Sequence, residues 1–454
     1  MEIVIIGAVA AGAKAAAKIK RLLPNSNVSI YTDDTHVSYS SCGLPYYIEG
    51  NFSDYKSLLV RSVEEFNASG INVYLETRVE KILIKEQQVL VRSLKHNEEK
   101  LVKYDRLIIA TGARPLIPNI KGIKDFDNVY TLRKIEDGIK IKEKMLQSKH
   151  AVIVGSGYIG LELLEAFVRN GLEVDVIEKN DRIMPMFDPD MSDIIKTRIE
   201  SCNTKTFAFH TGETVSEFLG EGRTLTHVKT HSGKMFKTDF VLLSAGIVPN
   251  SEIAKDAGIE IGESGAIKVN KLMQTSVHNI YACGDCCEEP HLISGHSVWV
   301  PLGSTANKEG RCAALNAAGV YTVFEGVLGS AVSRCLNTTM SMTGLTTKEA
   351  ESFGYTPVSA VVSKSDMVAY MPEASDITIK VIADKVTGLL LGGQAVGSLG
   401  ADKRINSLAS ALVGKLTVKQ FGSNDLTYSP PFSPTIDPLL DAMNILCTKI
   451  PRHC

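Results

Sequence analysis

The stretch Gly155-Ser156-Gly157-Tyr158-Ile159-Gly160 decides the predicted fold. It follows an apolar run at 150–154 and precedes a helix-like segment from Leu161. A strand, a G-x-G-x-x-G turn and a helix in this order cradle a pyrophosphate, because the glycines admit the phosphates and the helix N-terminus attracts negative charge. The stretch therefore predicts a Rossmann-like dinucleotide-binding unit.

The next predicted strand, within 171–178, ends at Glu178, at the spacing of an acid that binds the adenosine ribose. A carboxylate at this position repels a 2′-phosphate, which favours NADH over NADPH. Lys179 follows directly and leaves room for NADPH.

A degenerate copy of the pattern opens the chain, where an apolar strand leads to Gly7-Ala8-Val9-Ala10-Ala11-Gly12 and an alanine-rich helix. Val9 replaces the middle glycine, but strand, turn and helix keep their order. The strand 28–31 should then present an acid to a second ribose. Thr32 stands where this acid is expected, so the next residue, Asp33, is the candidate to within one position.

Between the two units lies Ser38-Tyr39-Ser40-Ser41-Cys42-Gly43-Leu44-Pro45-Tyr46-Tyr47. Gly43 and Pro45 fit a turn that enters a helix, where unpaired N–H groups and the helix dipole lower the pKa of a thiol. The next cysteine is Cys202, so no local dithiol is available. Cys42 is predicted to react with an oxygen, a sulfur or a substrate thiol, although most free cysteines are simply buried.

Three cations, Lys14, Lys18 and Arg21, share one face of the first predicted helix. They predict an anion site near Cys42, suited to a phosphorylated ligand. A solvated basic face is the alternative.

Composition limits the function classes. The chain has 454 residues, 44% of them hydrophobic, and a net charge of −2, which predicts several domains and no nucleic-acid partner. The N-terminus enters a strand without a signal peptide, and no apolar run could span a bilayer. Nine irregularly spaced cysteines fit reduced thiols. We expect a cytoplasmic protein with no membrane partner.

Three further apolar strands end in glycine turns, at Thr111-Gly112, at Gly246 and at Gly284-Asp285. Together with the two units, these motifs resemble the flavoprotein disulfide reductases with two dinucleotide-binding domains, over nearly the whole chain. The resemblance implies an α/β fold with three domains in a homodimer. These are a discontinuous FAD-binding domain (1–115 and 246–322), an NAD(P)H-binding domain (116–245) and a C-terminal α+β dimerisation domain (323–454).

The resemblance also assigns cofactor contacts. It implies that Asp285 holds the flavin ribityl chain, that Tyr158 gates the nicotinamide pocket and that Glu162 lies beside the flavin ring. The residues expected to bind the cofactors are Gly7, Gly12, Asp33, Ser41, Thr111, Gly112, Gly155, Gly157, Tyr158, Gly160, Glu162, Glu178, Gly246, Gly284 and Asp285.

The cysteine stretch indicates the branch of this family. Glutathione-reductase-like members have a second cysteine where this chain has Tyr47, and a C-terminal His–Glu pair with no match in 450–454. The single cysteine resembles the branch of NADH oxidase, NADH peroxidase and coenzyme A disulfide reductase. Its oxidases and peroxidases carry a histidine where this chain has Ala10, and the turn is similar to that of coenzyme A disulfide reductases. This similarity implies a thiol ligand on Cys42 rather than a stabilised sulfenic acid.

Tyr370 and Tyr428 match a tyrosine pair that coenzyme A disulfide reductases project from the partner subunit toward the cysteine. The implied activity is NAD(P)H-dependent reduction of a coenzyme A disulfide, coenzyme A persulfide or polysulfide through FAD and Cys42. Tyr428 would protonate the leaving thiolate and Tyr370 would position it. The residues expected to bind coenzyme A are Lys14, Lys18, Arg21 and Ser38.

Several questions stay open at this point. An NADH oxidase or peroxidase that uses a cysteine sulfenic acid and a low-turnover flavin redox sensor are the alternatives. No metal is expected at Cys283, Cys286 and Cys287, because they overlie the Gly284-Asp285 turn and lack zinc-spaced partners. No role is assigned to these cysteines or to Cys454. No fused rhodanese-like domain is expected, because the chain ends after the dimerisation domain.

Overall fold

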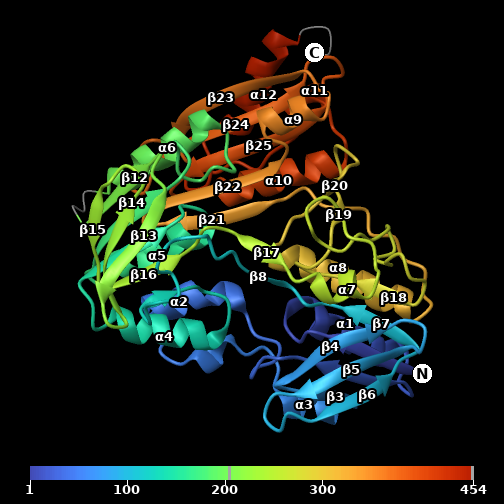
Figure 1. The fold of residues 1–454 in the computed structure, drawn as a ribbon. Helices are drawn as coiled ribbons and strands as arrows, with labels where there is room; N and C mark the ends of the chain where they lie inside the picture. Colours follow the sequence, from blue (N-terminus) through green and yellow to red (C-terminus); the bar gives the residue numbers. More distant parts are fainter. Residues whose placement is uncertain (203–205, 451–454) are drawn as a thin grey trace.

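The computed structural model describes residues 1–202 and 206–450, which form three five-stranded sheets with their covering helices and four smaller sheets of two or three strands (Figure 1). The first sheet is parallel and has the order β18-β7-β1-β2-β3. Its strands are β1 (Glu2–Ile6), β2 (Asn27–Tyr31), β3 (Ile71–Tyr74), β7 (Arg106–Ile109) and β18 (Ile280–Ala282). Helices α1 (Ala10–Leu22) and α8 (Gly303–Ala317) pack against each other beside it.

The second sheet is also parallel and has the order β12-β11-β10-β16-β9. Its strands are β9 (Val129–Tyr130), β10 (His150–Val154), β11 (Glu173–Glu178), β12 (Phe207–Thr211) and β16 (Phe240–Leu243). Its helices are α4 (Ile135–Met145), α5 (Tyr158–Arg169) and α6 (Pro189–Glu200).

The third sheet is antiparallel, with the order β21-β22-β25-β24-β23. Its strands are β21 (Ala331–Cys335), β22 (Thr338–Gly344), β23 (Pro357–Ser365), β24 (Asp376–Asp384) and β25 (Leu390–Gly397). Helices α10 (Ala401–Val413) and α12 (Pro438–Lys449) pack on it (Figure 1). Two parallel α/β units and one α+β unit confirm the predicted fold class.

The chain passes between the first two units twice. Strand β8 (Ala113–Pro115) leaves the first unit and pairs antiparallel with β17 (Ile247–Pro249), which returns to it. The expected domain boundaries at 115 and 246 fall at this pair.

The segment that carries Cys42 packs on the second unit. Cys42 lies in a single 3-10 turn, η1 (Ser41–Gly43), and α2 (Leu44–Glu49) follows with Pro45 in its first turn, as predicted. Leu44, Tyr47 and Ile48 share a core with residues of α4 and α5. The approach is close, because a Cβ added to Gly138 would lie 2.9 Å from Leu44 Cδ2. The Cys42 segment therefore lies where the first two units meet.

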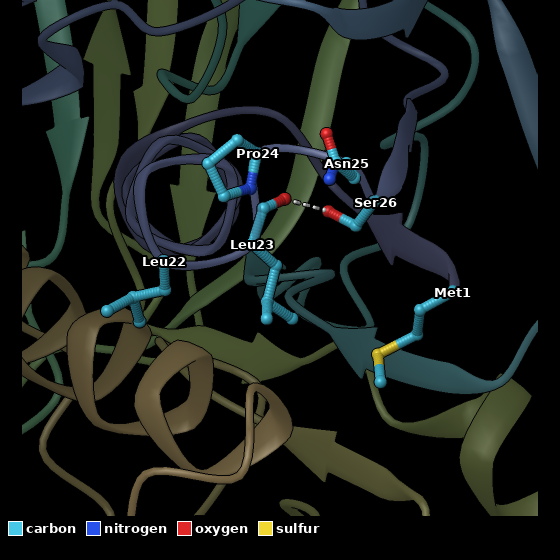
Figure 2. Close-up of a pocket in the computed structure, with 6 residues that line it drawn as sticks. All are labelled: Met1, Leu22, Leu23, Pro24, Asn25 and Ser26. Carbon is cyan, nitrogen blue, oxygen red and sulfur yellow. Dashed lines mark hydrogen bonds between the residues drawn. The ribbon is translucent and has the colours of Figure 1, made fainter.

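A surface cavity of about 260 Å³ lies at the amino ends of β1 and β2, lined by Met1 and residues 22–26 (Figure 2). Ligands of open α/β sheets bind beyond the carboxyl ends of the strands, so this cavity is on the wrong side for the cofactors. Across the described residues, no helix is long and apolar enough to cross a membrane.

Candidate active site

The two glycine turns have the same backbone geometry. Gly7 N–H donates to Tyr31 O at 2.8 Å, and Gly155 N–H donates to Ile177 O at 2.8 Å. Both glycines have φ of +104°, and an added Cβ would lie 2.1 Å from Ala110 O or 2.2 Å from Ser244 O. No other residue fits at these two positions.

The helices that follow these turns begin without a side-chain cap, at Val9 for α1 and at Gly157 for α5. Their first N–H groups are therefore available to an anion. An added Cβ at Gly157 would have only Met186 Cε near it, at 3.8 Å, so this glycine leaves space where a pyrophosphate would approach the backbone. These features fit a dinucleotide at each unit.

The acid that ends β11 is held by four donors. Glu178 Oε2 accepts from Ser156 N–H and Oγ–H at 2.9 and 2.8 Å, and Oε1 accepts from Asn180 N–H and Nδ2 at 2.9 and 2.6 Å. In the first unit the same register puts Thr32, not an acid, directly after β2. Asp33 is one residue further and pairs with Lys134 at 3.3 Å and Arg78 at 3.4 Å.

Of the seven free cysteines in the described part of the chain, Cys42 alone is exposed. Its sulfur lies at the uncapped start of α8, since a Cβ added to Gly303 would be 3.8 Å from Cys42 Sγ. Desolvation and the carboxylates of Glu162 and Asp285 nevertheless raise the pKa of the thiol, against smaller lowering by Ser41 and Arg133. The expectation of a lowered pKa is wrong, because desolvation and the charges of Glu162 and Asp285 raise it, and α2 starts only after Cys42.

Glu162 projects from α5 toward the same region. Ser333 Oγ, from β21 of the third unit, donates to Glu162 Oε1 at 3.0 Å. Burial raises the pKa of Glu162 to about 7, although the Ser333 hydrogen bond opposes this. Tyr158, one turn earlier, has a raised pKa through burial and the Glu162 charge. The third unit thus supports a carboxyl group close to Cys42.

The Gly284–Asp285 turn is fixed from several sides. Arg133 Nη2 lies 3.0 Å from Asp285 Oδ2, and Trp299 Nε1 donates to Asp285 O at 2.9 Å. Gly284 has φ of +81°. Thr111, Gly112 and Gly246 lie at the neighbouring crossing, where Thr111 Oγ1 donates to Asn250 O at 2.6 Å. Of these turns, the one at Asp285 lies close enough to Cys42 for its carboxylate to raise the pKa of the thiol.

The remaining expected residues lie in two places. Lys14 and Lys18 are half-buried and Arg21 is exposed, all on α1, while Ser38 precedes the Cys42 turn with φ of +52°. Tyr370 and Tyr428 are 73% and 51% exposed on the third unit. Their loops touch, since Val368 N–H donates to Pro430 O at 3.2 Å.

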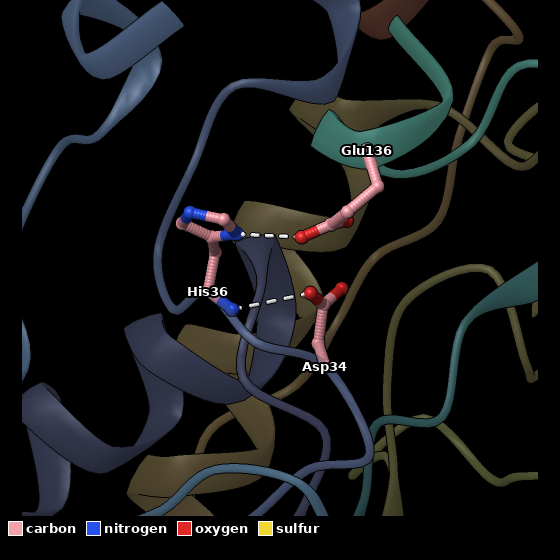
Figure 3. Close-up of side chains that lie close together, drawn as sticks. All are labelled: Asp34, His36 and Glu136. Carbon is pink, nitrogen blue, oxygen red and sulfur yellow. Dashed lines mark hydrogen bonds and ion pairs between the residues drawn. The ribbon is translucent and has the colours of Figure 1, made fainter. Parts of the chain in front are cut away.

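Sequence analysis did not find a cluster of Asp34, His36 and Glu136 (Figure 3). His36 Nδ1 lies 3.0 Å from Glu136 Oε1, and His36 N–H donates to Asp34 Oδ1 at 3.1 Å. The ligand atoms are close enough to hold a metal ion, but Lys134 Nζ is already 3.8 Å from Asp34 Oδ2. The cluster connects the first unit to the start of α4. His36 and Glu136 are 100 positions apart in the sequence, so no local motif contains both.

Comparison with known proteins identifies the family. The model "Pyridine nucleotide-disulphide oxidoreductase" matches residues 1–310, and its dimerisation domain matches 335–439. The chain is 36% identical over 454 residues to "NAD(P)H sulfur oxidoreductase (CoA-dependent)" of Pyrococcus furiosus, covering 98% of this chain and 99% of that protein. It is 33% identical to "NADH oxidase" of Methanocaldococcus jannaschii, covering 99% and 100%. The solved structure of "reduced Bacillus anthracis CoADR-RHD" has a TM-score of 0.95 and 30% identity, covering 99% of this chain and 81% of that chain.

Proposed function

Because the chain belongs to the pyridine nucleotide-disulphide oxidoreductase family, we propose that it uses NAD(P)H and FAD to reduce a coenzyme A disulfide, coenzyme A persulfide or polysulfide. One observation carries the proposal: Cys42 is the one exposed free thiol of the described chain, and it lies at the start of α8. A lone thiol there can form a mixed disulfide with a substrate but not an internal one with a neighbouring cysteine.

The first unit would bind FAD and the second unit the nicotinamide nucleotide. The uncapped starts of α1 and α5 support this assignment, since each offers free N–H groups to a pyrophosphate. When bound, FAD would supply two-electron transfer between the nicotinamide and sulfur. The buried Glu178 favours NADH, and the exposed Lys179 leaves NADPH as a second donor.

At the sulfur centre, the Cys42 thiolate would attack one sulfur of the substrate and release the other as a thiolate. Tyr428 of the other subunit would protonate this leaving thiolate, with Tyr370 positioning it. Two electrons would then cleave the mixed disulfide, freeing the second substrate group as a thiolate and restoring the Cys42 thiolate. The exposure of both tyrosines on the dimerisation domain supports their action across a homodimer.

The phosphates of coenzyme A would bind Lys14, Lys18 and Arg21, with Ser38 closer to Cys42. These cations share α1, which packs on α8, and α8 begins beside the Cys42 sulfur. A cytoplasmic location is part of the proposal, because reduced thiols at seven described cysteines suit a reducing compartment.

A second candidate function is NADH oxidase, the name of the Methanocaldococcus relative. In that reaction Cys42 would cycle through a sulfenic acid. Ala10 argues against it, because it offers no imidazole to support a sulfenic acid in the first glycine turn.

The test combines the mass of the purified protein with its rate of NADH-dependent disulfide reduction. Non-reducing intact mass with peptide mapping should find a coenzyme A adduct on Cys42, whereas one added oxygen there would favour the oxidase. Cys42→Ser should retain FAD and lose NADH-dependent disulfide reduction, and Cys202→Ser is the matched control that should keep it. Undiminished turnover in Cys42→Ser would refute the proposal.

A further inference from the structure

Two buried carboxyl groups that the proposed chemistry does not use flank the Gly284–Asp285 turn. Glu309 on α8 is 1% exposed, and Glu289, which follows the turn, is 2% exposed. Buried acids are normally paired with a cation, because an isolated buried charge is very costly. Within the described chain, neither carboxyl group forms an ion pair with a lysine, arginine or histidine.

The hydrogen bonds of Glu309 are unequal at its two oxygens. Gly284 N–H donates to Glu309 Oε2 at 2.6 Å, so the carboxyl group supports the turn directly. Cys287 Sγ lies 3.9 Å from the same oxygen. Glu309 Oε1 is buried and has no hydrogen-bond partner among the described residues. Oε1 therefore has no donor that would offset the cost of burying a charge, which disfavours the ionised form of Glu309.

The groups around Glu309 oppose its ionisation. Asp285 and Cys286 lie close to it in the turn, and Glu289, Cys283 and Cys312 are close enough to interact with it electrostatically. Arg133 lies nearby but is paired with Asp285. Burial, with the charges of Cys286 and Asp285, raises the pKa of Glu309, although the hydrogen bonds from Gly284 N–H and Cys287 oppose this. Burial, with the charges of Glu309 and Asp285, raises the pKa of Glu289, although the hydrogen bond from Val300 N–H opposes this.

We propose that Glu309 is a positioning residue for the FAD site: as a neutral carboxyl group it holds the Gly284–Asp285 turn in its binding geometry, and its ionisation weakens FAD binding. A charge on Glu309 would add to those of Asp285 and of the incoming pyrophosphate. This inference rests on the proposed role of Asp285 in FAD binding. It makes FAD retention, and not only turnover, dependent on pH.

The test measures the FAD dissociation constant of the full-length holoenzyme by equilibrium dialysis, at about pH 7 and about pH 9, on either side of the raised pKa. For the unmodified protein we expect about tenfold weaker binding at the higher pH, since one linked proton changes affinity by at most about tenfold per pH unit. Glu309→Gln keeps an oxygen for Gly284 N–H and cannot ionise, so its FAD affinity should be the same at both pH values.

Two further variants distinguish the effect of a charge on Glu309 from the effect of its hydrogen bond with Gly284 N–H. Glu309→Leu removes the acceptor of Gly284 N–H, so it should bind FAD more weakly at both pH values. Glu288→Gln is the control, because Glu288 is a neighbouring buried acid that accepts from Ser264 N–H at 2.9 Å, and it should keep the pH response of the unmodified protein.

A pH response retained in Glu309→Gln, or an unmodified protein whose FAD affinity does not change with pH, would overturn the inference and leave the proposed function intact. A protein that bound no FAD at either pH would instead overturn the proposed function, and this inference with it.

Discussion

The sulfur of Cys42 experiences two opposing electrostatic influences. The start of α8 favours a thiolate, while Glu162 and Asp285 disfavour it. The sequence predicts the local turn at this cysteine, because Gly43 and Pro45 are its neighbours. It could not predict the direction of the pKa shift, since both acids lie more than 100 positions away in the chain. A helix start can be predicted from neighbouring residues, but a charge from a distant part of the chain cannot.

At this scale we predict that Glu162→Gln lowers the pKa of the Cys42 thiol, because it removes a negative charge that raises it. The alkylation rate of Cys42 with iodoacetamide should rise severalfold above pH 7, where the unmodified Glu162 is ionised. Below that pH the alkylation rates of the two proteins should converge, since Glu162 is then protonated and neutral and cannot repel a thiolate.

The exposed Glu263→Gln variant is the control and should alkylate like the unmodified protein. If Glu162→Gln alkylated no faster at any pH, Glu162 would not control the ionisation of Cys42.

At the scale of elements, the two strand–turn–helix units show what a pattern can and cannot predict. The glycine positions followed from the motif, because the backbone approach at Gly7 and Gly155 excludes a side chain. The acid after the second strand was found in one unit, at Glu178, but in the other its position is occupied by Thr32. The ion pairs of Asp33 with Arg78 and Lys134 depend on tertiary contacts that no short motif encodes.

Substitutions of Gly157 and Gly160, in the second glycine turn, should affect protein stability and NADH binding differently. Gly157→Ala brings its Cβ only into ordinary van der Waals contact with Met186 Cε, at 3.8 Å, so the free energy of unfolding should change by less than about 1 kcal/mol, while the KM for NADH rises by about tenfold or more. Gly160→Ala brings a Cβ to 2.2 Å from Gly155 O and should destabilise the fold by about 1–3 kcal/mol. Urea unfolding and steady-state kinetics measure the two effects. Equal destabilisation by both variants would contradict this assignment.

At the scale of the whole molecule, buried polar contacts fix the second unit against the third. Lys380 on β24 lies 2.9 Å from Asp188 Oδ2 and 2.8 Å from Asp190 Oδ1, at the start of α6. Gln394 on β25 accepts from Asp188 N–H at 3.0 Å. These contacts link residues about 200 positions apart, so the sequence predicts the units but not how they are held together.

Lys380→Met should destabilise the protein by about 3–5 kcal/mol, because it leaves Asp188 as a buried carboxylate without its cation. Urea unfolding measures the loss. Lys385→Met, at an exposed lysine on the same hairpin, is the control and should change stability by less than about 0.5 kcal/mol. A loss as small as that of the control would show that the buried pair contributes little.

The last prediction concerns the proposed action of Tyr428 across a homodimer. Tyr428→Phe should slow disulfide reduction at least about tenfold through loss of an acid, with flavin reduction by NADH unchanged. Co-expressed, differently tagged subunits carrying Cys42→Ser and Tyr428→Phe should recover activity in the mixed dimer. One of its two sites then combines an intact cysteine with an intact tyrosine from the other chain. No recovery would mean that the tyrosine acts within its own subunit or not at all.

The order of strands in the first sheet has a consequence for synthesis on the ribosome. Strand β18 and helix α8 complete the unit that begins at β1, and they leave the ribosome only after the whole inserted second unit. The nascent chain must therefore carry an unfinished sheet with an open edge at β7 while the second unit folds. The Cys42 segment packs on that second unit, so the nucleophile acquires its surroundings in two stages, first from the insertion and last from α8.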